Sequence, residues 1–239
     1  MKFALLSLSR LSRRRLLSSA AGGSSGGGAG ADVKLALLEG ALLHVETLGW
    51  TDVALAKAAT EIGLSPLTHS LASRGAVELV EHFLKKKREH VSKVVLSFKD
   101  ELCVARERGD GAGEEPAGAQ QGIDKKRSVL LLTRAIEAHM DFIAPHRQTW
   151  SSALALVAAP QNALNTLGAV ADLADDLCEF ADIQATRSDW YTERCLLLAL
   201  YGSVELFVLT DSSVGLKESK DYLRRSVEMW DMARRRLKI

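Results

Sequence analysis

Proline, the residue that interrupts helices most strongly, is scarce in this chain. Proline occurs only 4 times in 239 residues, and the β-branched residues are scattered among many Leu and Ala. A strand needs β-branched or aromatic residues that alternate with polar ones, and no segment shows that alternation. We find no internal repeat. The composition therefore predicts an all-α fold, with enough apolar residues to bury a core in one domain or two small ones.

Cysteine and long apolar runs are also scarce. The three cysteines, Cys103, Cys178 and Cys195, are an odd number at unrelated spacings, which predicts reduced, buried thiols and no disulfide framework. The longest apolar run, from Cys195 to Leu209, contains Glu205 and is too short to cross a bilayer. We expect this run to form a helix that is buried on nearly every side.

Acidic residues are missing from residues 1–31, which hold Lys2, Arg10 and Arg13–Arg15 among Leu and Ser. These arginines interrupt the apolar core that a secretory signal needs, and the composition is typical of an organellar presequence followed by a Gly/Ser linker at 22–31. A disordered basic tail is the alternative. We expect the mitochondrion as destination, with the plastid second. The rest of the chain has 26 Lys and Arg against 30 Asp and Glu, which gives no general attraction for nucleic acid.

The sequence lacks the motifs of the common enzyme classes. It contains no nucleotide-binding glycine motif, no nucleophile elbow and no Cys–His pair of known spacing. The six histidines never recur three or four residues apart, and no Glu-x-x-His motif occurs, which a di-iron helical bundle would require. We therefore expect no catalytic residue, metal ligand or cofactor, and a helical enzyme is the least favoured class.

Apolar residues at helical spacing divide the chain into two halves. Helices are predicted over 33–48, 52–62, 76–107, 124–143, 146–158, 163–181, 189–209 and 216–237, with a short one that starts at Ser65 and Pro66. Thr51 is the predicted N-cap of the second helix, and Gly63 follows its last residue as a helix stop. The predicted organisation is a helix-turn-helix-like region at 32–107, a flexible loop at 108–122 and a C-terminal helical region at 123–239.

A helix-turn-helix raises the question of DNA binding. A recognition helix must bring Lys or Arg to phosphates, yet Lys57 is the only such residue between Trp50 and Ser73. A three-helix scaffold that binds no nucleic acid is therefore favoured. A transcriptional regulator that binds a small hydrophobic ligand is the alternative. The run Lys85–Arg88 is expected to be a solvated helix face, with contact to anionic lipid as a lesser alternative.

Two features of the second half indicate a contact surface. Trp190 and Tyr191 follow the predicted N-cap Asp189, and consecutive helical residues diverge by about 100°. Both rings therefore cannot enter the same core, and we expect at least one to be exposed for a partner. The helix before them carries acidic residues that we interpret as a solvated or partner-facing surface: Asp172, Asp175, Asp176, Glu179 and Asp182.

Short motifs in both halves carry a resemblance to a known family. In the first half they are Leu48-Gly49-Trp50-Thr51, Ala54-Leu55-Ala56, Ile62-Gly63-Leu64-Ser65, Arg74-Gly75 and Glu78-Leu79-Val80. In the second half they are Trp150 with Ala153-Leu154, Pro160-x-Asn162, Leu173-x-Asp175-Asp176, Asp189-Trp190-Tyr191-Thr192, Tyr201, Glu205-Leu206 and Asp211-x-Ser213. With these motifs the chain resembles the mitochondrial lipid-binding accessory proteins of ubiquinone (coenzyme Q) biosynthesis.

The resemblance implies a tetracycline-repressor-like helical bundle whose N-terminal helix-turn-helix has lost DNA binding. It implies a lipid-binding factor that holds an isoprenoid quinone intermediate in its C-terminal half. Such a factor presents the lipid to the demethoxyubiquinone hydroxylase on the matrix side of the inner mitochondrial membrane. By resemblance, Trp190 and Tyr191 lie on the patch that meets the hydroxylase, with Leu177 and Asp175 on the neighbouring helix. Arg234–Arg236 could contact the membrane surface, and homodimer formation is left open.

Overall fold

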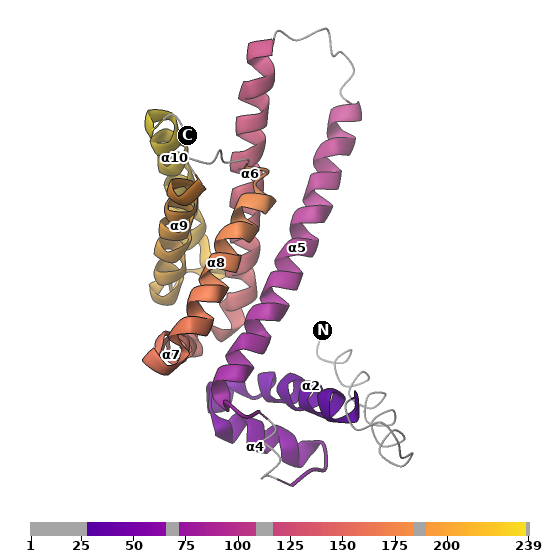
Figure 1. Cartoon of the computed structure of the whole chain (residues 1–239). Helices are drawn as coiled ribbons and strands as arrows, with labels where there is room; N and C mark the ends of the chain where they lie inside the picture. Colours follow the sequence, from indigo (N-terminus) through magenta and orange to yellow (C-terminus); the bar gives the residue numbers. More distant parts are fainter. Residues whose placement is uncertain (1–27, 66–71, 109–116, 184–189, 238–239) are drawn as a thin grey trace. The chain divides into compact units, whose positions relative to one another are not determined.

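Helices are the only regular structure in the parts of the chain that the computed structural model describes, residues 28–65, 72–108, 117–183 and 190–237 (Figure 1). The α-helices are α2 (Gly28–Leu42), α3 (Val45–Leu48), α4 (Asp52–Glu61), α5 (Ala76–Arg108), α6 (Ala117–Ile143), α7 (Arg147–Ala158), α8 (Ala163–Phe180), α9 (Trp190–Thr210) and α10 (Lys217–Leu237). Short 3-10 turns are η2 (Ala144–His146), η3 (Pro160–Asn162) and η4 (Val214–Leu216). The prediction of an all-α fold is confirmed. Among these described helices, none is long and apolar enough to span a bilayer.

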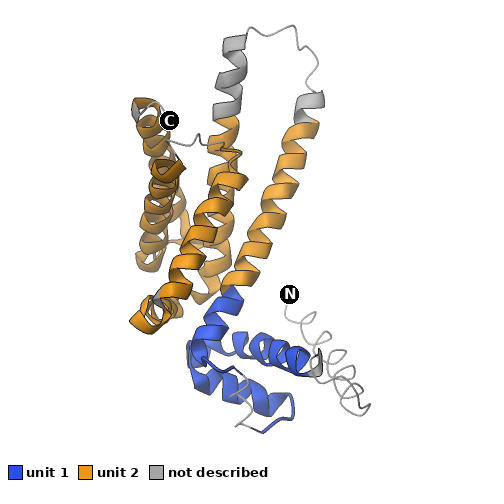
Figure 2. Ribbon diagram, in the orientation of Figure 1, with its two compact units in different colours: residues 1–83 blue, residues 84–239 orange. Residues whose placement is uncertain are grey.

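The chain divides into two compact units, residues 1–83 and 84–239, and the boundary lies within α5 (Figure 2). The sequence instead predicts this division in a loop at 108–122. The described part of that loop is helical at 117–122, because α6 begins at Ala117 in a segment rich in Ala and Gln, which are good helix formers. Residues 28–31 of the predicted linker are likewise part of α2.

Several predicted features lie outside the described residues. These are the basic segment and most of its linker at 1–27, the short third helix at 66–71, the loop at 109–116 and the predicted N-cap Asp189. Their sequence-based interpretations stay predictions.

Close packing of α2 against α4 forms the first unit. A Cβ on Gly40 would lie 3.3 Å from the Cβ of Ala58, so two small residues let these helices approach. The ring of Trp50 meets the ring of Phe83 edge-on, with centroids 5.2 Å apart. The core is completed by the apolar faces that helical spacing predicted, among them Leu37, Ala41, Val45, Leu55, Ala59 and Val80.

The ends of α4 lie where the sequence predicted them. The helix before α4 differs from its prediction. Gly63 has φ 81°, in the left-handed region that suits a residue just after a helix. The single helix predicted over 33–48 is instead divided into α2 and α3. The amides of Leu43 and His44 donate to carbonyls three residues back, those of Gly40 and Ala41, at 3.2 and 3.0 Å, which tightens and ends the α-helical turn there.

The start of α5 is capped from a neighbouring helix. The Asp52 Oδ1 atom accepts a hydrogen bond from the backbone N–H of Ala76 at 2.8 Å. Gly75, the residue before Ala76, has φ 59°. A Cβ on Gly75 would lie 2.5 Å from the same Asp52 oxygen. Glycine is therefore required here both for its backbone conformation and for the space that the capping carboxylate occupies.

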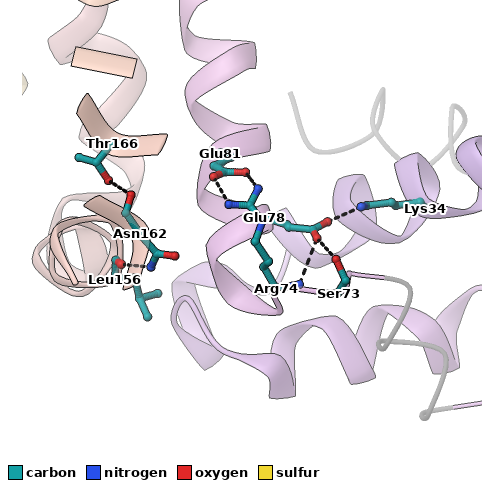
Figure 3. Close-up of polar contacts among 8 residues, drawn as sticks. All are labelled: Lys34, Ser73, Arg74, Glu78, Glu81, Leu156, Asn162 and Thr166. Carbon is teal, nitrogen blue, oxygen red and sulfur yellow. Dashed lines mark hydrogen bonds and ion pairs between the residues drawn. The ribbon is translucent and has the colours of Figure 1, made fainter. Parts of the chain in front are cut away.

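A buried carboxylate secures the first turn of α5 (Figure 3). Glu78 accepts hydrogen bonds from the Ser73 hydroxyl at 2.9 Å and the Arg74 N–H at 3.1 Å, and it forms an ion pair with Lys34 of α2. Burial acts to raise the pKa of Glu78, but these hydrogen bonds and the Lys34 charge lower it below its usual value. Arg74 in turn forms a two-point ion pair with Glu81.

The second unit has two apolar clusters on different faces of α6. Leu131 and Ala135 face one cluster, and Leu132, Ile136 and Met140 face the other. The first cluster adds residues of α5 and α8: Val91, Val95 and Phe180. The second is the main core and adds residues of α8, α9 and α10, including Leu177, Leu197, Val204, Leu223, Val227 and Trp230.

Polar side chains fix the turns between helices of the second unit. The buried Asn162 amide donates to the carbonyl of Leu156 at 2.8 Å, and the Thr166 hydroxyl donates to the carbonyl of Asn162 at 3.0 Å, which joins the end of α7 to the start of α8 (Figure 3). Before α10, the buried Asp211 carboxylate accepts from the N–H of Ser213 at 2.7 Å and from the N–H of Ser219 at 2.9 Å.

Candidate functional site

Two aromatic side chains are exposed on the first turn of α9. Trp190 is 40% exposed and Tyr191 is 74% exposed. Their rings meet edge-on with centroids 4.6 Å apart. The expectation that at least one of them lies on the surface is confirmed, and both side chains are exposed.

Arg194 fixes this pair to the preceding helix. Its guanidinium carbon lies 3.8 Å from the centroid of the Trp190 ring, a cation–π contact one helical turn along α9. Its Nε and Nη2 atoms both lie near Asp175 Oδ1 of α8, at 2.6 and 2.5 Å. We call Trp190, Tyr191, Arg194 and Asp175 the aromatic patch. Three of these residues were singled out in the sequence, and Arg194 was missed.

Leu177 lies on the helix next to the patch, as the resemblance implies, but it does not reach the surface. Its exposed fraction is 0%, and it packs in the main core. Residues two apart on a helix diverge by about 200°, so Asp175 and Leu177 cannot share a face. Leu177 therefore positions α8 beneath the patch.

The acidic surface predicted on α8 is mostly paired within the protein. Asp176 is buried and bonds to Arg88 of α5 at 2.6 Å, and Asp182 bonds to Lys99 of α5 at 2.5 Å. Burial raises the pKa of Asp176, and the Arg88 charge opposes that shift. The interpretation as a solvated or partner-facing surface is wrong for Asp176, which is buried against Arg88, whereas Asp182 pairs with Lys99 and stays exposed.

The run Lys85–Arg88 is likewise not a uniformly solvated face. Lys87 is buried, and its Nζ donates to the Tyr201 hydroxyl at 2.9 Å and lies 4.0 Å from Glu205 Oε1. The indole N–H of Trp150 donates to the same carboxylate oxygen at 3.1 Å. Burial lowers the pKa of Lys87, and the negative charge of Glu205 opposes this shift. Helices α5, α7 and α9 thus meet at one buried polar cluster.

A small cavity lies beside this cluster, between α6 and α9. Its volume is about 10 Å³, enough for one water molecule. The buried ring of His139 lines it and meets the Tyr201 ring edge-on, with centroids 5.3 Å apart. Tyr201 also lines the cavity, and the remaining lining residues are Ile136, Met140, Ile143, Val204, Glu205 and Val208.

His139 has no hydrogen-bond partner for either ring nitrogen within the described parts of the chain. Burial, followed by the nearby charges of Lys87 and His90, holds the pKa of His139 well below its usual value. The imidazole is therefore neutral at physiological pH, with one N–H donor and one acceptor nitrogen directed to the interior.

Some of these residues left a signal in the sequence. Lys87 lies four residues after Phe83 and four before Val91, so it occupies the apolar stripe of α5 and not its polar face. Arg194 lies four residues after Trp190, the spacing at which helical side chains meet. His139 had no comparable signal, because the absence of partners depends on the tertiary structure.

Metal ligands, cysteines and the apolar helix α9 are the remaining chemical features of the described residues. In the described residues, no three side chains of His, Cys, Asp or Glu gather in a way that could hold a metal ion. All three cysteines are free thiols, but only Cys178 is buried, and Cys103 and Cys195 are exposed. The helix predicted to be buried on nearly every side, α9, has Leu206 as well as Cys195 on its exposed side.

Comparison with known proteins shows that the aromatic patch, together with Tyr201 and Glu205 of the buried polar cluster, lies in a segment that matches a protein family. Residues 163–233, which hold α8, α9 and most of α10, match the COQ9 family. Over 184 residues the chain is 31% identical to the probable ubiquinone biosynthesis protein coq9, mitochondrial, of Dictyostelium discoideum, a match that covers 77% of this chain and 54% of the relative.

Two animal relatives give similar values. The chain is 28% identical to the mitochondrial ubiquinone biosynthesis protein COQ9 of Homo sapiens over 192 residues, 80% of this chain and 55% of the relative. It is 28% identical to that of Drosophila melanogaster over 196 residues, 82% of this chain and 54% of the relative. The chain spans about half the length of these curated relatives.

Proposed function

Because the chain belongs to the COQ9 family, we propose that it acts in ubiquinone biosynthesis as a lipid-binding accessory factor rather than as an enzyme. Its role is to bind an isoprenoid quinone intermediate and to present it to the demethoxyubiquinone hydroxylase. The observation that carries this proposal is the aromatic patch, which lies in the segment that matches the family.

The patch has the composition of a protein-binding surface. Trp, Tyr and Arg are the residue types that contribute most to binding energy at interfaces. Here Trp190 and Tyr191 expose their rings next to a guanidinium group that is itself held by Asp175. We assign this patch to the hydroxylase.

The interior of the second unit supports the lipid half of the proposal. The cavity between α6 and α9 is lined mainly by aliphatic side chains, which suit an isoprenoid tail. Its volume is about 10 Å³, so a tail can enter only if side chains of α6 and α9 move apart.

Contact with the inner membrane is proposed for the exposed side of α10. Arg225, Met229, Met232 and Arg236 recur at four-, three- and four-residue intervals, so they share one exposed face. Exposed methionines between arginines suit the surface of an anionic bilayer. Arg234 is not part of this face, because it pairs with buried Glu193 and lies over the Trp230 ring.

A mitochondrial location follows from the same reasoning. The relatives are named mitochondrial, and residues 1–31 have the composition of a presequence. We propose import to the matrix side of the inner membrane. Fusion of residues 1–31 to a fluorescent reporter should direct the reporter to mitochondria, and a reporter that stays in the cytosol would refute this proposal.

The test of the function uses the full chain, co-expressed with the hydroxylase and purified from membranes. Native mass spectrometry should show a complex of the two proteins, and lipid extraction should yield an isoprenoid quinone or a precursor of one. Recovery of bulk phospholipid alone, with no hydroxylase bound, would contradict both parts of the proposal.

A further inference from the structure

An unpaired histidine in a protein interior needs an explanation. The His139 side chain is buried on every side, and neither ring nitrogen has a hydrogen-bond partner among the described residues. Buried polar groups in folded proteins are nearly always paired, because an unpaired one loses its hydration without compensation. If the position served packing alone, a leucine would fill it at lower cost. The nitrogens therefore lack a partner that the described residues could supply, and a bound molecule would provide one.

The surroundings indicate which kind of partner would bind. His139 opens on the cavity of about 10 Å³, and the aromatic ring of Tyr201 forms an adjacent wall. The buried cation Lys87 and the carboxylate Glu205 lie 4.0 Å apart behind Tyr201, so their charges largely cancel. A phosphate or carboxylate in the cavity would be repelled by Glu205, because Lys87, the cation nearby, is already paired with Glu205. An uncharged oxygen would not be repelled.

We propose that His139 binds the ring end of the lipid: a carbonyl or hydroxyl oxygen of a quinone or phenol head group occupies the cavity beside it. This inference rests on the proposed function. The neutral imidazole can donate its N–H to a quinone carbonyl or accept a hydrogen bond from a phenol hydroxyl. The hydrocarbon tail then contacts the aliphatic lining, which includes Ile136, Ile143 and Val208.

Entry of a ring requires the cavity to open. At about 10 Å³ there is room for one oxygen atom, and the atoms next to it belong to residues of α6 and α9. Met140 lies in this lining, and its unbranched side chain is of the type that repacks most readily in a core. Hydrogen bonds from Lys87 to Tyr201 and from Tyr201 to Glu205 hold one side of the cavity, so the opening has to come from the other lining residues.

The test measures binding of decylubiquinone and of dioleoylphosphatidylglycerol vesicles to the full chain. We expect His139→Leu to weaken decylubiquinone binding about tenfold, the effect of one lost hydrogen bond and a changed wall, with vesicle binding unchanged. His139→Gln, which keeps one donor and one acceptor, should retain most of the affinity. The matched control is His90→Leu, because His90 is exposed on α5 and does not line the cavity.

The outcomes separate this inference from the proposed function. If the wild-type chain binds neither probe, the proposed function fails and the inference with it. If wild type binds decylubiquinone and a folded His139→Leu variant binds it equally well, the inference alone fails, and His139 holds a structural water only. If His139→Leu does not fold, His139→Phe carries the same test, because it keeps the ring against Tyr201 and removes the nitrogens.

Discussion

The guanidinium carbon of Arg194 lies 3.8 Å from the centroid of the Trp190 ring, and the same guanidinium group bonds to Asp175. The indole therefore packs against a guanidinium group that also joins α9 to α8. This arrangement leaves 40% of Trp190 exposed and gives its ring a fixed orientation at the surface.

Truncation of this ring should affect binding more than folding. We expect Trp190→Ala to weaken hydroxylase binding by about thirtyfold or more, since exposed aromatic anchors at interface centres contribute about 2 kcal/mol or more. The loss of unfolding free energy should be about 1 kcal/mol, from the cation–π contact. Affinity and melting temperature of the same variant are the measurements.

Leu164→Ala, at an 86% exposed residue of α8, is the control and should change neither. A Trp190→Ala variant that melts many degrees lower but still binds would place the partner surface elsewhere.

Substitution of Arg194 tests whether the orientation of the indole matters. Arg194→Lys keeps the charge but loses the planar group that stacks on Trp190 and reaches Asp175 with two nitrogens. We expect hydroxylase affinity to fall by about threefold to tenfold, with less than about 1 kcal/mol lost from stability. Asp175→Asn should act through the same contact, so the double variant should bind no worse than Arg194→Lys alone. Additive losses would mean that the two residues contact the partner independently.

Two glycines with left-handed backbone allow a matched test of the cap on α5. Gly75→Ala must place a Cβ where Asp52 Oδ1 now lies, whereas no described atom lies within 4 Å of a Cβ on Gly63. Alanine in the left-handed region costs about 1–2 kcal/mol at either position. Gly75→Ala should lose about 1 kcal/mol more, because the Asp52 cap on Ala76 breaks. Urea unfolding of both variants checks this, and equal losses would show that the cap contributes nothing.

The carboxylate before α10 should make part of the stability depend on pH. Burial acts to raise the pKa of Asp211, but hydrogen bonds from Ser213 and Ser219 lower it well below its usual value. The stabilisation is therefore complete above the unfolded-state pKa of about 3.9 and is lost as the pH falls through the lower folded-state pKa. Asp211→Asn removes one of the two carboxylate acceptors, and we expect it to cost about 2 kcal/mol at pH 7.

Urea unfolding at pH 7 and at pH 3 is the measurement for Asp211. The difference between wild type and Asp211→Asn should be smaller at the lower pH, where the wild-type carboxylate begins to lose its advantage. Asp221→Asn is the control, because Asp221 forms only a surface ion pair with Arg224 through its side chain, which is worth less than about 1 kcal/mol. A difference that stays constant or grows toward low pH would contradict the assigned pKa shift.

Helical periodicity was sufficient to predict most of the helices, because their apolar residues recur at 3.6-residue spacing and the turns carry Gly, Pro or Asn. Periodicity did not predict the end of α2 at Leu43 and His44, because both residue types are compatible with a helix. The helix ends there because their amides bond three residues back instead of four. Several motifs that carry the family resemblance build turns and caps. Gly75 accommodates the cap on α5, and Asp211 caps the turn before α10.

The site was predictable only where exposure follows from local geometry. Adjacent Trp190 and Tyr191 must diverge on any helix, so their exposure could be inferred from the sequence. Lys87 shows the opposite case, because a run of four basic residues was interpreted by composition and not by the face that each one occupies. Its burial depends on Tyr201 and Glu205, which are more than a hundred residues away in the chain.

The first turn of α9 is tied to both of its neighbours by consecutive residues. Glu193 bonds to Arg234 of α10 at 2.9 Å, and Arg194 bonds to Asp175 of α8 at 2.6 Å. Helix ends commonly fray, and a partner that binds a frayed end must order it at a cost of about 0.5–1.5 kcal/mol for each immobilised side chain. Because these two ion pairs preorganise the turn before any encounter, Trp190 and Tyr191 meet a partner with little conformational entropy left to lose.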